Sequence, residues 1–217
     1  ILRGLIVFYL VRGDVQTAYK LKQQFLILAQ HVQDPAHLTE AHYTMGGAMF
    51  TFGEFTAARE HFEQGIAFYD PHKHRTLTLV YGHDPQMANL SFLAHTLWLL
   101  GYPEQGLKRI HQSLLWVQEL SEPYNLGGVF GHTAQHHLYR REGRAAYEQA
   151  KASLAIAAEQ GFAMLVANGN IWKGAALAEQ GQGAAAVVLI RQGVDACLAI
   201  HSVIWRGHHL ALLAEAY

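Results

Sequence analysis

The sequence predicts an all-α protein built as a stack of antiparallel helical hairpins, and two observations carry that prediction. A glycine is repeatedly followed, five positions later, by a small residue, and the leading glycines lie 40, 48, 42 and 38 residues apart. Apolar residues around each glycine recur with the period of a helix. A recurrence on this scale indicates repeated supersecondary units rather than one globular core. The pattern occurs at Gly13…Ala18, Gly53…Ala58, Gly101…Gly106 and Gly181…Ala186, with a degenerate copy at Gly143…Glu148.

Composition limits the classes of protein to which the chain can belong. Of 217 residues, 51% are hydrophobic and 15% are charged, which argues against disorder. The net charge of −1, with both signs scattered, lacks the basic footprint of a nucleic-acid-binding protein or of an electrostatic membrane anchor. The single cysteine, Cys197, excludes an internal disulfide framework and suits a reducing compartment. We therefore expect a cytoplasmic protein that binds neither nucleic acid nor membrane.

The first eleven residues are the most apolar stretch of the chain. Arg3 interrupts this stretch and Arg12 follows it, whereas a membrane span needs about 20 apolar residues. We interpret it as a helix whose apolar surface meets a preceding repeat. Because the chain opens with Ile1 and stops at Tyr217 inside an apparent helix, we expect it to be a piece of a larger protein.

The third unit shows the hairpin pattern most clearly. An apolar stripe with helical spacing runs from Leu90 to Leu97, and a second runs from Leu107 to Val117. Between them, Gly101 ends the first helix and Pro103 begins the next. Two helices joined by so few residues must lie antiparallel, each burying its stripe on the other.

The remaining units follow the same logic with two notable features. Gly46 and Gly174 lie inside predicted helices, where glycine lowers helix stability by about 1 kcal/mol relative to alanine. We therefore expect that these glycines allow a close contact with the neighbouring helix. The connection from Tyr69 to Met87 is unusually long and predicts either an extended helix tail or a loop of about a dozen residues. Within one repeat domain over 1–217, the predicted units are 1–34, 37–71, 86–122, 125–161 and 164–201, followed by a partial unit at 204–217.

These residues make the chain resemble the tetratricopeptide repeat (TPR) superfamily. Its consensus, W-x₂-L-G-x₂-Y…A-x₃-F…P, is matched best in the second unit, by Met45-Gly46, Met49, Ala58, Phe62 and Pro71. The mean spacing of 42 residues exceeds the consensus and resembles longer-repeat bacterial regulators. The resemblance implies a right-handed superhelix, an α-solenoid, of about five hairpins.

Four phrases also resemble the C-terminal repeat region of bacterial signalling proteins that join a cyclase or kinase domain to an ATPase. They are YGHDP (81–85), LWLLGYPEQGLKR (97–109), LAEQGQG (177–183) and IRQGVDA (190–196). The relatives use these repeats as a sensing or partner-docking surface.

No motif in the chain predicts catalysis or a cofactor. Gly101 and Gly106 have the glycine spacing of a phosphate-binding loop, but Leu107 and Lys108 replace the required Lys and Ser/Thr. The i, i+4 pair His132 and His136 has zinc-ligand spacing, yet the metalloprotease glutamate is missing, so this pair is only a weak metal candidate. We therefore expect a protein that is not an enzyme and holds no metal.

The inner face of the superhelix is the predicted binding site, because the first helix of each hairpin lines the concave groove in TPR arrays. Aromatic, histidine and arginine side chains suit a peptide, with rings as anchors and Arg140 for a carboxylate. Packing between hairpins is the alternative role, above all for Trp98. The register counted from the elbow glycines places in the groove Tyr43, Phe50, His95, Trp98, Phe130, Thr133, His137 and Arg140. The same count adds Glu40 and Ser91.

The expected function is therefore that of a non-catalytic scaffold that binds a protein or peptide partner within a bacterial signalling or regulatory protein. The alternative is a small-molecule sensor domain that regulates an attached ATPase, cyclase or transcription regulator.

Self-association through uncapped ends is a first testable expectation, because terminal repeats without a polar cap expose apolar surface. We expect homo-oligomers formed through Leu2, Leu5, Ile6 and Tyr9. Light scattering at increasing concentration measures this, and a strictly monomeric profile would contradict it.

Overall fold

The computed structural model describes every residue from Ile1 to Tyr217 and contains twelve helices and no strand, which confirms the all-α prediction. None of the twelve helices combines the length and the apolar character needed to cross a membrane. The helices are α1 (Leu2–Val11), α2 (Val15–Val32), α3 (Pro35–Phe52), α4 (Phe55–Phe68), α5 (Leu77–Tyr81), α6 (Pro85–Leu99), α7 (Pro103–Leu120), α8 (Pro123–Tyr139), α9 (Gly143–Gln160), α10 (Ala163–Glu179), α11 (Gly183–Ala199) and α12 (Arg206–Ala216).

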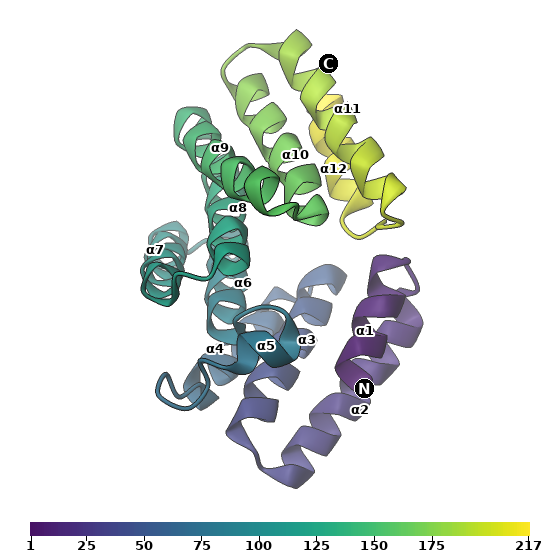
Figure 1. The fold of residues 1–217 in the computed structure, drawn as a ribbon, viewed down its shortest axis with the longest axis vertical. Helices are drawn as coiled ribbons and strands as arrows, with labels where there is room; N and C mark the ends of the chain where they lie inside the picture. The colour runs from purple at the N-terminus through teal and green to yellow at the C-terminus, as the bar shows by residue number, and fades with distance from the viewer. The chain divides into compact units, whose positions relative to one another are not determined.

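The chain divides into two compact units, Ile1–Trp116 and Val117–Tyr217. In the first unit, α1 packs on α2 and α3 packs on α4, while α2 also contacts α3 and α4 contacts α6 (Figure 1). In the second unit, α8 packs on α9 and α10 packs on α11. Helix α9 also contacts α10, and α11 also contacts α12. Each hairpin therefore buries its apolar stripe within itself and against the next hairpin.

The elbow between the paired helices is the same left-handed turn in every hairpin. Gly13, Gly53, Gly101 and Gly181 have φ between 76° and 85°, a region that glycine adopts without steric cost. The residue after each glycine donates its backbone N–H to a carbonyl five positions back, as Glu54 does to Met49 at 2.9 Å. This bond is the mark of a Schellman motif, which satisfies the last carbonyls of the first helix.

The fourth elbow lies two residues earlier than the sequence pattern indicated. Arg141, not Gly143, takes the left-handed conformation with φ 58°, and Glu142 N–H donates to the His137 carbonyl at 2.9 Å. The small residue five positions on is therefore Ala146, which is fully buried, and not Glu148. Gly143 is needed for another reason, since a Cβ there would lie 2.7 Å from Glu179 Cβ on α10. With this register, the spacings of the elbows become 40, 48, 40 and 40 residues.

Two glycines inside helices allow the close contact that the sequence predicts. A Cβ at Gly46 on α3 would lie 2.6 Å from the ring of Phe62 on α4, and Phe62 is fully buried. A Cβ at Gly174 on α10 would lie 2.6 Å from Ile190 and 2.9 Å from the Ala186 carbonyl oxygen on α11. At these two positions the helices of the hairpin lie too close together to accommodate a methyl group.

The long connection between the second and third hairpins forms neither an extended helix tail nor an open loop. Helix α4 ends at Phe68, and the short helix α5 follows before a left-handed residue, Gly82, with φ 78°. The connection is held by its own polar contacts, since the Asp70 N–H donates to His74 Nδ1 at 3.0 Å and His74 is buried. We call residues 69–84 the insertion.

The first helix does not present its whole apolar surface to solvent. Ile6 is buried against Phe25, Ala29, Leu38 and Ala41, so it cannot contribute to the end-to-end contact expected above. Leu5 remains exposed.

A pair of histidines, the buried His42 and the half-buried His61, lies between α3 and α4. His42 Nδ1 and His61 Nδ1 are 3.0 Å apart, and the His42 ring stacks on Phe68. Burial, together with the neighbouring His61, lowers the pKa of His42 to about 4, and burial also lowers the pKa of His61. One ring nitrogen must donate and the other accept, so this contact requires at least one neutral imidazole.

The glycine pair on α3 yields a prediction with a built-in control. Gly46→Ala should lower the free energy of unfolding by about 1–3 kcal/mol, because the new methyl group overpacks against Phe62. Gly47→Ala should raise it by about 0.5–1 kcal/mol, because that position is helical and open, with no atom within 4 Å of an added Cβ. Urea unfolding followed by circular dichroism measures both, and stabilisation by both substitutions would contradict the tight packing of α3 on α4.

The histidine pair predicts a loss of stability in mild acid. The folded-state pKa of His42 lies below the unfolded-state value of about 6.5, so its contribution is intact above that pH and falls as the pH drops toward 4. His42→Gln should reduce this decline by an amount on the order of 1–3 kcal/mol. The matched control is His111→Gln at an exposed position of α7, which should leave the pH dependence unchanged. Equal profiles for the two variants would contradict the assignment.

Candidate functional site

A partly exposed aromatic cluster lies on α3 and α6 in the first unit. The ring of Phe92 on α6 is 5.8 Å from the rings of both Tyr43 and Phe50 on α3, each in an edge-on arrangement. These three half-buried side chains pack over a core that contains Phe62 and Leu93. We call Tyr43, Phe50 and Phe92 the aromatic cluster. Edge-on aromatic pairs stabilise such a surface by about 0.5–1.5 kcal/mol beyond their burial.

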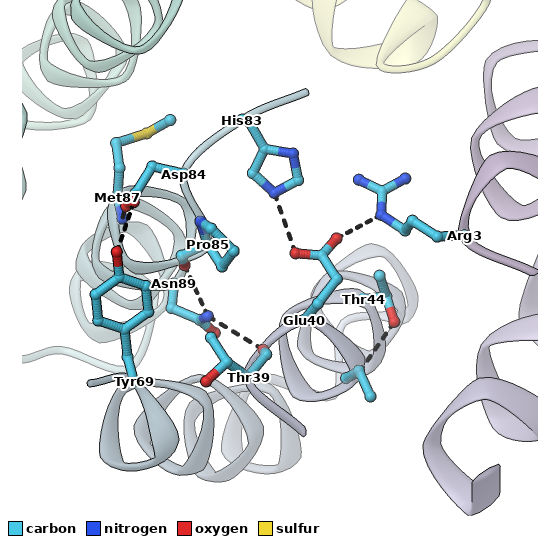
Figure 2. A network of polar contacts seen from close by, with 11 residues as sticks. Arg3, Thr39, Glu40, Thr44, Tyr69, His83, Asp84, Pro85, Met87 and Asn89 are labelled. Atoms are coloured by element: carbon cyan, nitrogen blue, oxygen red, sulfur yellow. Dashed lines mark hydrogen bonds and ion pairs between the residues drawn. The ribbon is translucent and has the colours of Figure 1, made fainter. Parts of the chain in front are cut away.

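A buried carboxylate lies beside the aromatic cluster and connects three segments of the chain. Glu40 on α3 is fully buried, forms an ion pair with Arg3 of α1 and lies beside His83 of the insertion, whose Nε2 is 3.3 Å from Glu40 Oε2. Figure 2 shows the two partners reaching the carboxylate from different sides. The His83 ring also lies 5.1 Å from the Tyr43 ring, which joins this polar group to the aromatic cluster.

The electrostatics of Glu40 favour its charged form despite its burial. Burial alone would raise the pKa of the carboxyl, but His83 and Arg3 outweigh it, so the pKa lies below its ordinary value. Arg3 shows the reciprocal effect: burial opposes its charge, but Glu40 nevertheless raises the pKa of the guanidinium. Removing one partner of such a buried pair leaves an uncompensated charge, so Glu40 acts mainly as a structural anchor beneath the aromatic cluster.

A second buried carboxylate, Asp84, fixes the beginning of α6. Its Oδ1 accepts from the Met87 N–H at 2.8 Å, as a helix N-cap does, and from Trp116 Nε1 of α7 at 3.0 Å. Its Oδ2 accepts from the Tyr69 hydroxyl at 2.8 Å (Figure 2). Burial and the Asp84 charge raise the pKa of Tyr69, so the phenol remains a donor. The insertion is thus fastened at both of its ends.

The predicted groove residues of the first unit fall into two groups. Tyr43 and Phe50 meet in the aromatic cluster, and His95 approaches it, with its ring 6.1 Å from Phe92. His95 is only 1% exposed, however, whereas Trp98 is half-buried one turn further along α6. Glu40 and Ser91, which the register placed in the groove, are both fully buried and pack in the interior.

The predicted residues of the second unit lie on α8 and at the turn after it. His137 Nδ1 lies 2.6 Å from Glu142 Oε2, and Arg140 Nε donates to Glu142 Oε1 at 2.9 Å. The carboxylate expected from a ligand of Arg140 is therefore supplied by the chain itself. Thr133 is 1% exposed and its hydroxyl donates to the Val129 carbonyl, while Phe130 is half-buried. Because the elbow lies at Arg141, these four residues are displaced by two positions from the register of Tyr43, His95 and Trp98.

The structure brings together no group of three or more His, Cys, Asp and Glu side chains that could hold a metal ion. His136 of the weak candidate pair is fully buried in the interior of its unit, and His132 is half-buried. Cys197 is buried as well, and burial raises the pKa of its thiol.

Sequence reasoning missed two residues of the site, Phe92 and His83. Phe92 adjoins Ser91, which the elbow register selected in its place and which is fully buried. His83 belongs to the insertion, and the 48-residue spacing was the signal that this segment departs from the repeat. What the arrangement offers chemically is aromatic contact area beside a shielded charged group, and not a nucleophile paired with a base.

The chain is similar to solved structures of helical repeat proteins. No protein-family model and no curated protein matches the chain. Among solved structures, BtubC (BKLC) from P. vanneervenii is similar over 92% of this chain and 79% of its own, with 17% identity and a TM-score of 0.61. Two crystal structures of a putative kinesin light chain from Podosopora anserina with nearly identical TPR-like repeats, one of them carrying a single substitution, are also similar. The substituted form gives a TM-score of 0.59 at 16% identity and the other 0.56 at 18%, both over 90% of this chain and 92% of theirs.

At such identities the likeness concerns the fold alone, and it agrees with the helices packed in consecutive pairs. It supports the TPR part of the sequence resemblance, whereas the resemblance to cyclase- and ATPase-linked proteins stays a prediction. The chain therefore has the fold of a TPR-like helical repeat protein.

Proposed function

We propose that this chain is a scaffold that binds a protein or peptide segment, and that the aromatic cluster of α3 and α6 is its anchoring surface. The observation that carries the proposal is that Tyr43, Phe50 and Phe92 lie side by side and each stays partly exposed. Aromatic side chains with a fixed geometry are the typical anchors of protein interfaces. The TPR-like fold supports the same role, because arrays of this kind present extended binding surfaces.

The anchor surface is prepared in advance by the polar group beside it. Glu40, Arg3 and His83 hold α1, α3 and the insertion around Tyr43 without needing a ligand. A rigid surface loses little conformational entropy on binding, which favours affinity. Within a bacterial signalling protein, as the sequence phrases suggest, such a surface would dock a partner for an attached cyclase or ATPase.

A second candidate function is small-molecule sensing, and one observation favours it. The first unit contains a cavity of about 270 Å³ away from the aromatic cluster, between α4, α6 and α7.

Phe50 and Phe52 provide a matched test of the anchoring surface. Peptides selected from a display library on the immobilised protein should bind Phe50→Leu about tenfold more weakly, because an aromatic anchor is lost. Phe52→Leu lies on the same helix, but its ring packs on Tyr19 instead, so it should leave the affinity within twofold. Isothermal titration calorimetry measures both affinities.

Thermal unfolding of the two variants separates binding from stability. Exchange of one hydrophobic side chain for another of similar size costs less than about 1.5 kcal/mol, so both variants should stay folded. Failure to enrich any peptide, or equal affinities for the two variants, would rule out the aromatic cluster as the anchor.

A further inference from the structure

A cavity of about 270 Å³ opens between three helices of the first unit, apart from the aromatic cluster. Helix α7 contributes one face at i, i+3 and i+7, namely Arg109, Gln112 and Trp116. Gln86 and Leu90 lie one turn apart on α6, and Ile66 completes the lining from α4. The lining therefore combines three apolar side chains with three polar ones.

The walls of the cavity are held in place independently of any ligand. The Ser113 hydroxyl of α7 bonds the Met87 carbonyl at 3.1 Å and lies 3.0 Å from the Ser91 hydroxyl. The Trp116 indole is fixed by its 3.0 Å bond to Asp84. The cavity is thus a preformed feature of the packing between α6 and α7.

Arg109 brings a positive charge to this cavity that the chain does not neutralise. Its Nη1 donates to the neutral amide of Gln112 at 3.0 Å, and no carboxylate lies within ion-pair distance. A second cation, Arg75 of the insertion, lies over the Trp116 ring with its guanidinium carbon 5.8 Å from the ring centroid. The guanidinium of Arg109 presents five N–H donors suited to a planar carboxylate, and one bond to an amide leaves most of them available.

Gln86 contributes a polar atom that lacks a hydrogen-bond partner. Its side-chain oxygen is buried and has no hydrogen-bond partner, whereas buried polar atoms in folded proteins are nearly always paired. Leaving such an atom unpaired destabilises the folded protein. A ligand that donates a hydrogen bond here would recover the lost free energy.

We propose that this cavity binds a compact organic acid: a carboxylate for Arg109, a hydroxyl or amino donor for Gln86, and an apolar or aromatic body against Leu90, Ile66 and Trp116. The size of the cavity agrees with this class, because a cavity of about 150 Å³ accommodates benzene and this one is nearly twice as large. The site is separate from the aromatic cluster, so it does not depend on the scaffold function proposed above.

Three small molecules test the three parts of the ligand. Mandelate carries the phenyl group, the hydroxyl and the carboxylate; phenylacetate lacks the hydroxyl; and mandelamide lacks the charge. Titration calorimetry with the unmodified protein should show saturable binding of mandelate, about tenfold weaker binding of phenylacetate, and still weaker binding of mandelamide.

Matched variants assign the contacts. Arg109→Gln should weaken mandelate binding at least tenfold, because a charged hydrogen bond is lost. Lys108→Gln, which removes the adjacent exposed cation, should change it less than twofold. Gln86→Leu should abolish the advantage of mandelate over phenylacetate without lowering the thermal stability, because it removes a buried unpaired oxygen.

The comparison of ligands on the unmodified protein keeps the proposal falsifiable even if a variant fails to fold. Equal binding of mandelate and mandelamide would show that Arg109 does not select for a carboxylate. Absence of saturable heat at millimolar mandelate would overturn the site altogether. Either result would leave the peptide selections on Phe50→Leu and Phe52→Leu unaffected.

Discussion

The constraint on which the structure depends is the close approach of the two helices of a hairpin. At Gly46, Gly174 and Gly193 an added Cβ would lie within 2.5–2.6 Å of an atom on the facing helix, closer than real Cβ contacts. Small residues after the elbows, such as Ala58 and Ala186, are fully buried for the same reason. This spacing decides which side chains remain at the surface, because anything on the facing stripe is enclosed.

The fold could be predicted because repeated local signals all favour the same architecture. Helical periodicity and elbow glycines act within a few residues, so they can be recognised without knowledge of the tertiary structure. The fourth elbow shows the limit of this reasoning. Arg141 adopts a conformation that glycine normally occupies, and it pairs with Glu179, a residue far along the chain. Gly143, two residues away, is a packing glycine, and sequence alone does not distinguish the two roles.

The candidate site was predictable only in part, because groove and core positions share one helical register. Tyr43 and Phe50 lie at the partly exposed surface, but His95 and Glu40 from the same count are enclosed. Glu40 is enclosed together with Arg3 and His83, which come from other segments of the chain. A polar residue type at a repeat position therefore does not reveal whether it faces a partner or a neighbouring helix. The cavity beside Trp116 had no signature in the sequence, since its six lining residues are ordinary members of three helices.

The insertion has a consequence for how such an array can diversify. Repeat arrays are held together by contacts between neighbours, so extra residues between two hairpins need not disturb the others. Here residues 69–84 deliver His83 to Glu40 on one side and Asp84 to Trp116 on the other. A single segment therefore reaches both surfaces of the unit for which a ligand is proposed. Variation in this one stretch could retune two recognition surfaces together while the hairpins that carry them stay the same.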